Sequence, residues 1–167
     1  MVYLKLGYIA ASTQLQSTPM QRMICLEYDS AAIIRSGMIQ ERIEEVTRAN
    51  QEFYEAFEHL DIARMDQIWA KQDYVTCIHP GWTHRVGWPA VRDSWVLIFN
   101  NTFSMKFELA DILVQVAGDV AWVICVENIT SHQGETTQES QILATNLYER
   151  IESRWLLIHH HGSPVMG

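Results

Sequence analysis

The segment Val120–Thr130, with the sequence VAWVICVENIT, says more about the fold of this chain than any other stretch. Every residue from Val120 to Val126 is apolar, and side chains along a β-strand point alternately to its two faces. A strand with water on one face alternates apolar with polar residues instead. We therefore predict a strand over this segment with an apolar layer against each of its faces.

Three further segments have the composition of strands: Ser104–Val116, Gln138–Arg150 and Arg154–His161. Short polar segments connect consecutive strands: Gly118-Asp119, His132–Thr137 and Glu152-Ser153. Connections this short favour antiparallel neighbours. In the first strand the apolar alternation changes phase at Ala110-Asp111, which predicts a β-bulge. This part of the chain is therefore predicted to form a strongly bent antiparallel sheet.

The residues before the strands show helical periodicity. Apolar residues recur at spacings of three and four along a first segment: Ile39, Ile43, Val46, Ala49, Phe53, Phe57 and Leu60. Asp61 can cap a shorter second helix that carries Ile62, Met65, Ile68 and Trp69. Pro89 suits the first turn of a third helix with Val91, Trp95, Ile98 and Phe99. A short strand, Tyr74–Ile78, separates the second and third helices and ends at His79-Pro80-Gly81. The predicted class is α+β, with three N-terminal helices packed on the bent sheet.

Length and charge limit the possible functions. A chain of 167 residues is long enough for one well-buried core, and the periodic pattern begins after Met38. We predict an N-terminal extension over residues 1–37 and a domain over residues 38–167. The formal net charge of −8 disfavours binding to nucleic acid or anionic lipid. With no apolar stretch of membrane-spanning length, the sequence predicts neither nucleic acid nor membrane as a partner.

The cysteines and the N-terminal residues bear on location. Cys25, Cys77 and Cys125 are odd in number and far apart, which fits a reducing compartment better than a disulfide framework. The apolar run Leu6–Ala11 is shorter than the roughly 7 to 15 residues of a signal-peptide core. We therefore predict a cytoplasmic protein.

Several short motifs occur in one order along the chain: CIHPGW at Cys77–Trp82, SW at Ser94-Trp95, ATN at Ala144–Asn146 and WLLIHHHGSP at Trp155–Pro164. This order and spacing resemble SnoaL-like domains of the nuclear transport factor 2-like superfamily. The terminal strand also resembles the association domain of calcium/calmodulin-dependent protein kinase II. The resemblance covers about residues 38 to 167. It implies a cone of helices over a bent sheet, a deep pocket between them, and frequent dimerisation.

Function varies within the families that this resemblance indicates. They include ketosteroid isomerase, polyketide cyclases, dehydratases, ligand carriers and assembly domains, so the fold alone does not select an activity. The acid–base set of ketosteroid isomerase has no residue-by-residue counterpart in this sequence. The resemblance therefore implies the pocket and no particular reaction.

The short turn at Glu152-Ser153 gives a prediction for the register of the last two strands. Pairing across it sets Arg150 opposite Trp155 and, stepping back, Asn146 opposite His159. The predicted pocket face then carries Asn146, Tyr148, Trp155, Leu157, His159 and His161, with His160 on the other face. On the neighbouring strand Asn128 shares a face with Trp122, Ile124 and Val126. The resemblance to the superfamily implies that Asn128 and Asn146 line the pocket, and Glu127 falls on the opposite face.

The candidate site residues follow from this register. His79 ends the first strand beside a Pro-Gly turn, and Trp69, Trp82 and Trp95 come from elements near the mouth of the cone. His79 and His159 are the candidate catalytic bases. The candidate ligand-binding residues are Trp69, Trp82, Trp95, Asn128, Asn146, Tyr148 and His161. For the histidines a purely structural role, hydrogen-bonded inside a core, is an equal alternative, and for the tryptophans core packing is the stronger one.

The three consecutive histidines also suggest a transition metal, since His159 and His161 share a face. No H-x-x-x-H helix or cysteine cluster completes a ligand set, so the sequence predicts no bound metal, and it indicates no cofactor. Three functions remain open: a binding module for a small, partly apolar molecule; a lyase, isomerase or cyclase with a pocket histidine as general base; and an assembly domain. The binding module is favoured because no acid–base pair is recognisable.

The strand that is apolar on both faces also predicts self-association. The helices of one chain can cover only one face of the sheet, so a second copy is the simplest cover for the other. We predict a homodimer through the outer sheet face, with Val123 as a candidate interface residue.

Overall fold

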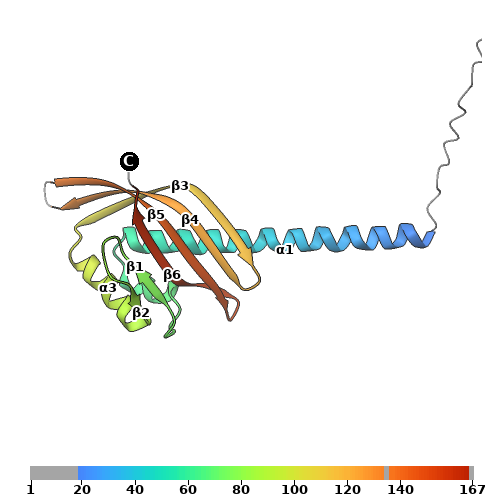
Figure 1. The fold of residues 1–167 in the computed structure, drawn as a ribbon, viewed down its shortest axis with the longest axis horizontal. Coiled ribbons are helices and arrows are strands. Elements are labelled where there is room, and N and C mark those ends of the chain that lie inside the picture. The colour runs from blue at the N-terminus through green and yellow to red at the C-terminus, as the bar shows by residue number, and fades with distance from the viewer. Residues whose placement is uncertain (1–18, 134–135, 166–167) are drawn as a thin grey trace, which may run out of the picture. The chain divides into compact units, whose positions relative to one another are not determined.

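The computed structural model describes residues 19–133 and 136–165, which form an α+β fold with three helices and a curled, unclosed six-stranded sheet (Figure 1). In chain order the elements are α1 (Pro19–Glu58), α2 (Ile62–Ile68), β1 (Thr76–Ile78), β2 (Arg85–Val86), α3 (Trp88–Asn100), β3 (Ser104–Ala117), β4 (Val120–Gln133), β5 (Thr136–Ile151) and β6 (Arg154–Pro164). The predicted fold class is confirmed.

The chain divides into two units, Met1–Gly37 and Met38–Gly167. Residues 1–18 of the predicted extension lie outside the described residues, and residues 19–37 are helical as the first part of α1. Among the helices that the structure describes, none combines the length and the apolar character needed to cross a lipid bilayer. All the features discussed below belong to the second unit.

The sheet has the strand order β2-β1-β6-β5-β4-β3. The four long strands are consecutive antiparallel neighbours, and β1 joins them by running parallel to β6. The sequence predicted this first strand over Tyr74–Ile78, whereas it spans Thr76–Ile78. It did not predict β2, whose two residues Arg85–Val86 lack any alternation that could identify them.

Local signals in the sequence account for the turns and bends of the long strands. The predicted bulge is confirmed, because β3 pairs Ala110 with Val126 but Leu113 with Ile124, so three steps along β3 match two along β4. Glu152 and Ser153 both have positive φ, of 48° and 67°. This is the backbone of a two-residue hairpin turn whose twist matches that of the flanking strands.

Residues at the start of the two shorter helices, α2 and α3, favour the beginning of a helix at these positions. The side chain of Asp61 accepts a hydrogen bond from the backbone N–H of Arg64 at 3.0 Å, which satisfies one of the free donors of the first turn. Pro89 lies in the first turn of α3, where its missing N–H removes no helical hydrogen bond.

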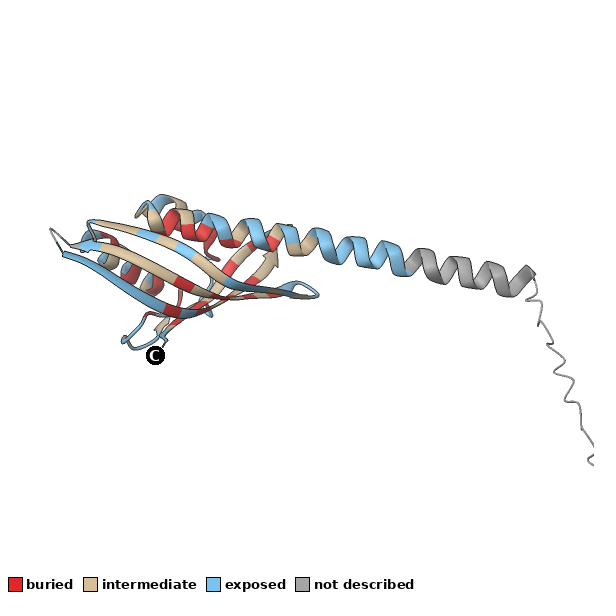
Figure 2. Cartoon of the chain, turned by 90° about the horizontal axis from the view of Figure 1, so that it is seen from above, coloured by how far each residue is buried: buried red, intermediate tan, exposed pale blue. Residues whose placement is uncertain are grey.

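The hydrophobic core lies between the helices and the inner face of the sheet, as the band of buried residues in Figure 2 shows. On β4 the inward residues are Ala121, Val123, Cys125 and Glu127, all of them buried. The outward residues of the same strand are Trp122, Ile124, Val126 and Asn128, which are half-buried. Val123 is 0% exposed, so it belongs to the core and not to an outer-face interface as the sequence suggested.

Candidate functional site

A cavity of about 300 Å³ opens between α1 and β3, which is one of the two edge strands of the described sheet. One wall consists of four apolar side chains of β3: Phe107, Leu109, Ile112 and Val114. The opposite wall is one face of α1: Thr47, Asn50, Gln51, Tyr54, Glu55 and Glu58. The volume lies at the small end of the range for small-molecule sites, and an apolar wall facing a few polar groups is typical of such sites.

Asn50 and Tyr54 connect this cavity to a buried polar cluster. Both line the cavity and are only 3% and 5% exposed. The Nδ2 amide of Asn146 on β5 donates to Asn50 Oδ1 at 2.9 Å and to the Tyr54 hydroxyl oxygen at 3.2 Å. Tyr148 also donates to Asn50 Oδ1, at 3.0 Å. These bonds hold the helix against the middle of the sheet and fix which polar atoms reach the cavity.

A single buried carboxyl group completes the cluster beside Tyr54. The Tyr54 hydroxyl donates to Glu127 Oε1 at 2.6 Å, and Glu127 is 2% exposed. Burial raises the pKa of Glu127 from 4.5 to about 7, although the hydrogen bond from Tyr54 opposes that rise. A carboxyl group in this environment exchanges its proton near neutral pH, which is a property of general acids and bases.

His160 is the histidine that belongs to this cluster. Its Nδ1 lies 2.6 Å from Asn146 Oδ1. Because the Nδ2 amide of Asn146 already donates twice, Oδ1 is the acceptor and the His160 proton sits on Nδ1. Burial holds the pKa of His160 well below its ordinary value, so the imidazole is neutral and fixed in one tautomer.

A second group of polar residues surrounds His79 and does not line the cavity. His79 Nε2 lies 2.9 Å from the Ser94 hydroxyl, and its ring packs edge-on against Trp95 at 4.6 Å and Trp82 at 5.1 Å between centroids. Burial lowers the pKa of His79 from 6.5 to about 4. These contacts are those of a hydrogen-bonded core histidine.

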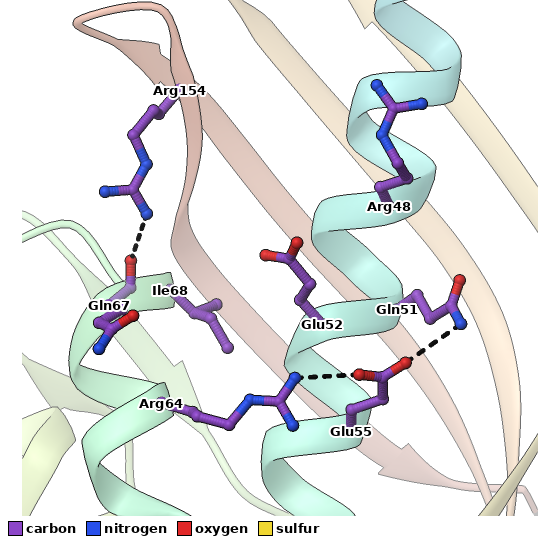
Figure 3. A pocket seen from close by; sticks show the side chains of 8 residues that line it. All are labelled: Arg48, Gln51, Glu52, Glu55, Arg64, Gln67, Ile68 and Arg154. Carbon is purple, nitrogen blue, oxygen red and sulfur yellow. Dashed lines mark hydrogen bonds and ion pairs between the residues drawn. The ribbon is translucent and has the colours of Figure 1, made fainter.

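A groove of about 480 Å³ lies on the other side of α1, between that helix, α2 and the β5–β6 turn (Figure 3). Its lining is strongly charged: Arg48, Gln51, Glu52, Glu55, Arg64, Gln67, Ile68 and Arg154. Arg64 pairs with Glu55 at 2.9 Å, and Arg154 donates to the Gln67 carbonyl at 3.1 Å. The groove is wide and polar, so it lacks the apolar wall that the first cavity provides.

The register predicted for the last two strands is wrong beyond Tyr148. Arg150 does lie opposite Trp155, but Asn146 lies opposite His160 and Leu147 lies opposite His159. The register shifts between Leu147 and Tyr148 because β6 has an extra residue there, Ile158. A one-residue slip moves every later side chain to the other face. His160 therefore lies inside and His159 outside, the reverse of the prediction.

The outer face accordingly holds three of the predicted site residues. His159 is half-buried, with Nδ1 2.6 Å from the Thr76 hydroxyl, and His161 is exposed. Asn128 bridges strands on that face, accepting from Gln141 at 2.8 Å and donating to the Glu108 carbonyl at 3.2 Å. None of the three lines the cavity between α1 and β3.

Of the other predicted site residues, Asn146 and Tyr148 belong to the buried cluster. Trp69 and Trp95 are buried in the core at 1% and 0% exposure, and Trp82 is half-buried with the guanidinium of Arg85 5.4 Å from its ring centroid. The predicted convergence of His79, Asn146 and His159 on one cavity is therefore not found.

Four residues of the cluster were not predicted: Asn50, Tyr54, Glu127 and His160. A signal for the first two exists, because Asn50 and Tyr54 follow Val46 at intervals of four and so share the buried face of the helix. A polar residue on such a face must have buried partners. From the sequence, Glu127 and His160 were assigned to the outer face of the sheet. The observed strand register places both on the inner face.

No group of three or more His, Cys, Asp or Glu side chains within the described residues is arranged to hold a metal ion. His159 and His161, whose ring centroids are 6.3 Å apart, form a pair without a third ligand there.

Comparison with known proteins identifies the family to which this chain is similar. A family model described as a SnoaL-like domain matches residues 46–167. A crystal structure from Streptomyces avermitilis, described as a candidate dehydratase of the NTF2-like family, is 34% identical, with a TM-score of 0.74, and the match covers 77% of this chain and 99% of that one.

Two other relatives have different descriptions. A candidate calcium/calmodulin-dependent protein kinase type II association domain from Thiobacillus denitrificans is 31% identical, with a TM-score of 0.65, and the match covers 71% of this chain and 93% of that one. The F-box protein SKIP8 of Arabidopsis thaliana is 28% identical over 121 residues, which make up 72% of this chain. The match spans 50% of that relative's length.

Proposed function

Because the chain belongs to the SnoaL-like domain family, we propose that its domain binds a small, largely apolar molecule in the cavity between α1 and β3. One observation carries the proposal: apolar residues of β3 face a helix from which Asn50 and Tyr54 reach the cavity. These two polar residues are held in place by buried partners. Rigid polar groups in an apolar cavity orient a ligand at low entropic cost.

The hydrogen bonds within the cluster indicate what remains available to a ligand. Asn50 Oδ1 accepts from both Asn146 and Tyr148, whereas Asn50 Nδ2 donates to no oxygen that the structure describes. The Tyr54 hydroxyl donates to Glu127, and its oxygen accepts from Asn146 at 3.2 Å and lies 3.4 Å from Cys125 Sγ, so its hydrogen-bonding capacity is used within the protein. A ligand with an apolar body and one small polar group therefore fits this cavity.

Filling the cavity should abolish binding. We expect 2-(1-naphthyl)ethanol to shift the NMR signals of the Leu109, Ile112 and Val114 methyl groups in the wild-type protein. In Leu109→Trp the larger side chain occupies the cavity, and the affinity for the probe should fall at least tenfold, about 1.4 kcal/mol.

The matched control is Leu97→Trp, the same substitution at a residue of α3 that is 52% exposed and does not line the cavity. It should bind the probe as the wild type does. Equal binding by both variants, with melting temperatures near that of the wild type, would place the ligand elsewhere and refute the proposal.

A second function, acid–base catalysis, is favoured by the pair Tyr54 and Glu127. Here the Tyr54 oxygen takes a proton from the ligand while the Tyr54 hydroxyl proton passes to the ionised carboxylate of Glu127. The geometry supports this pair, at 2.6 Å and beside the cavity, over the histidines chosen from the sequence. Turnover that is lost in Tyr54→Phe while binding persists would distinguish the enzyme from the binding module.

We also propose that the domain forms a homodimer through the outer face of the sheet. Apolar residues of three neighbouring strands lie on that face: Leu113, Trp122, Ile124, Val126, Leu143 and Leu147. Leu113 and Leu143 are 49% and 46% exposed. A second copy would remove this surface from water, which favours association.

Leu143→Glu should shift the protein from dimer to monomer at micromolar concentration in sedimentation velocity, because a charge would be buried in the apolar interface. The control, Phe103→Glu, adds the same charge at a loop residue that is 81% exposed and should remain dimeric. A wild-type monomer would contradict the proposal, and a larger oligomer would favour an assembly role.

A cytoplasmic location is part of the same proposal. Cys77 and Cys125 are buried free thiols, and free thiols persist most readily in a reducing compartment. Fractionation of the cells that express the protein tests this location.

A further inference from the structure

The charged residues that line the cavity are acidic. Glu55 and Glu58 line it directly, and Glu127 lies immediately behind Tyr54. Neither Lys, Arg nor His occurs among its lining residues within the described part of the chain. Apolar walls have a low dielectric constant and screen charge poorly. The negative electrostatic potential of the carboxyl groups therefore acts strongly on a ligand in the cavity.

The three carboxyl groups do not contribute equally to that potential. Glu55 is paired with Arg64 at 2.9 Å, and this hydrogen bond keeps the pKa of Glu55 low, so its negative charge is largely offset. Glu58 Oε1 accepts only the backbone N–H of Phe107, at 3.2 Å. Glu127 accepts only the neutral Tyr54 hydroxyl on Oε1, and its Oε2 accepts no hydrogen bond from a described residue. Two of the three carboxyl groups, Glu58 and Glu127, therefore have no basic partner among the residues that the structure describes.

The arginines of the neighbouring groove do not line this cavity. Gln51 and Glu55 lie on the ridge of α1 that separates the two and line both. Arg48, Arg64 and Arg154 line the groove (Figure 3) and not the cavity. An anion would be drawn to the groove, and a cation or an uncharged donor to the cavity.

We propose that the cavity selects positively charged and uncharged molecules against anions, and that its preferred ligand is an apolar amine whose ammonium group lies near Glu58 and within the field of the buried Glu127. This inference rests on the proposed binding function and specifies its ligand class. An ammonium group is a donor without acceptor capacity, which suits the carboxylate of Glu58 on the cavity wall. A carboxylate there would lose its hydration without gaining a cationic partner, which is strongly unfavourable.

Binding of the amine should depend on pH through Glu127. The side chains around Glu127 are Tyr54 of α1, Cys125 of its own strand and Cys77 of β1, while its cross-strand neighbours Leu109 and Ile142 are apolar. Burial raises the pKa values of Tyr54, Cys77 and Cys125, so none of the three ionises near neutrality. Glu127 is therefore the group in this environment that gains a charge between pH 6 and pH 8.

Three probes that share one ring system test the selection: 2-(1-naphthyl)ethylamine, 2-(1-naphthyl)ethanol and 1-naphthylacetate. Their affinities are measured by NMR shifts of the Leu109, Ile112 and Val114 methyl groups. We expect the amine and the alcohol to bind, the acetate to bind at least tenfold more weakly than the amine, and the amine alone to tighten severalfold from pH 6 to pH 8. Acetate binding as tight as amine binding would overturn the inference. If none of the three shifts these methyl groups, the proposed binding site itself fails.

Two variants locate the source of the selection. Glu127→Gln should abolish the pH dependence of amine binding, and Glu58→Gln should lower the ratio of amine to acetate affinity severalfold. Glu139→Gln, which makes the same change of net charge at an exposed residue of β5, should alter neither. An effect of Glu139→Gln equal to that of Glu58→Gln would attribute the selection to the overall charge of −8 and refute the local account.

Discussion

Replacing Asn146 with alanine is expected to lower the free energy of unfolding by about 3 kcal/mol. Asn146 is 0% exposed, and its amide bonds to Asn50, Tyr54 and His160 at distances between 2.6 and 3.2 Å. Truncation leaves the buried His160 Nδ1–H without its partner and removes one bond each from Asn50 and Tyr54, which keep their bonds to Tyr148 and Glu127. Each unsatisfied group costs about 1 to 3 kcal/mol, whereas the same bond adds only about 1 kcal/mol when it forms in place of a bond to water.

Urea unfolding at pH 7.5 measures this loss, and Asn128→Ala is the matched control. Asn128 also makes two hydrogen bonds, to Gln141 and to the Glu108 carbonyl. It lies on the outer face, where water can replace both partners, so its truncation should cost less than about 1 kcal/mol. Equal losses in the two variants would mean that the cluster around Asn146 contributes no special stability.

The sequence predicted the fold because its signals are local. The spacing of apolar residues predicted the helices, and Asp61 and Pro89 marked the starts of two of them. The phase change at Ala110-Asp111 located the bulge of β3. Each of these features is decided by interactions within a few residues, which is why one sequence suffices to find them.

The site depended on a non-local feature that no pattern marks. The extra residue Ile158 in β6 follows Leu157 and precedes His159 within an unbroken run of strand-forming residues. Counting back from the turn at Glu152-Ser153 therefore gave the correct pair at Arg150 and the wrong one at Asn146. Since the side-chain period of a strand is two, that single residue exchanged His160 for His159.

The face of β4 was misassigned for a related reason. Its two faces are both apolar near Val123, so hydrophobicity could not show which one meets the helices. The structure puts the smaller residues under the helices and leaves Trp122 and Ile124 outside. Glu127 follows the inner set, and its burial beside Tyr54 could not be recognised without that assignment.

Glu127→Gln is expected to make the protein more stable than the wild type at pH 8, by up to about 3 kcal/mol, and to leave stability nearly unchanged at pH 4.5. The folded-state pKa of Glu127, about 7, lies above its ordinary value of 4.5. The folded protein therefore holds this proton more tightly than the unfolded chain does. The stabilisation is complete below pH 4.5 and is lost as the pH rises to about 7. That interval of pKa corresponds to about 3 kcal/mol.

Glutamine keeps an acceptor for the Tyr54 hydroxyl and never ionises. The variant therefore does not lose stability at this position as the pH rises to about 7. The pKa of His79, lowered to about 4 by burial, acts in the opposite direction: its contribution is present above pH 6.5 and is lost as the pH falls towards 4. His160, whose pKa burial also lowers, acts in the same sense as His79. Both histidines are present in the wild type and the variant, so their effects cancel in the difference between the two stabilities.

The measurement is therefore a difference curve, from urea unfolding of both proteins at half-unit steps between pH 4.5 and pH 8. Glu139→Gln, an exposed residue of β5, is the control for the change of one charge and should give a flat curve. A difference that rises with pH and levels off above pH 7 would assign the titration to Glu127. A flat curve for Glu127→Gln would show that the carboxyl group ionises at its ordinary pKa in the folded protein. The pH-dependent part of the ligand selection would then have no basis.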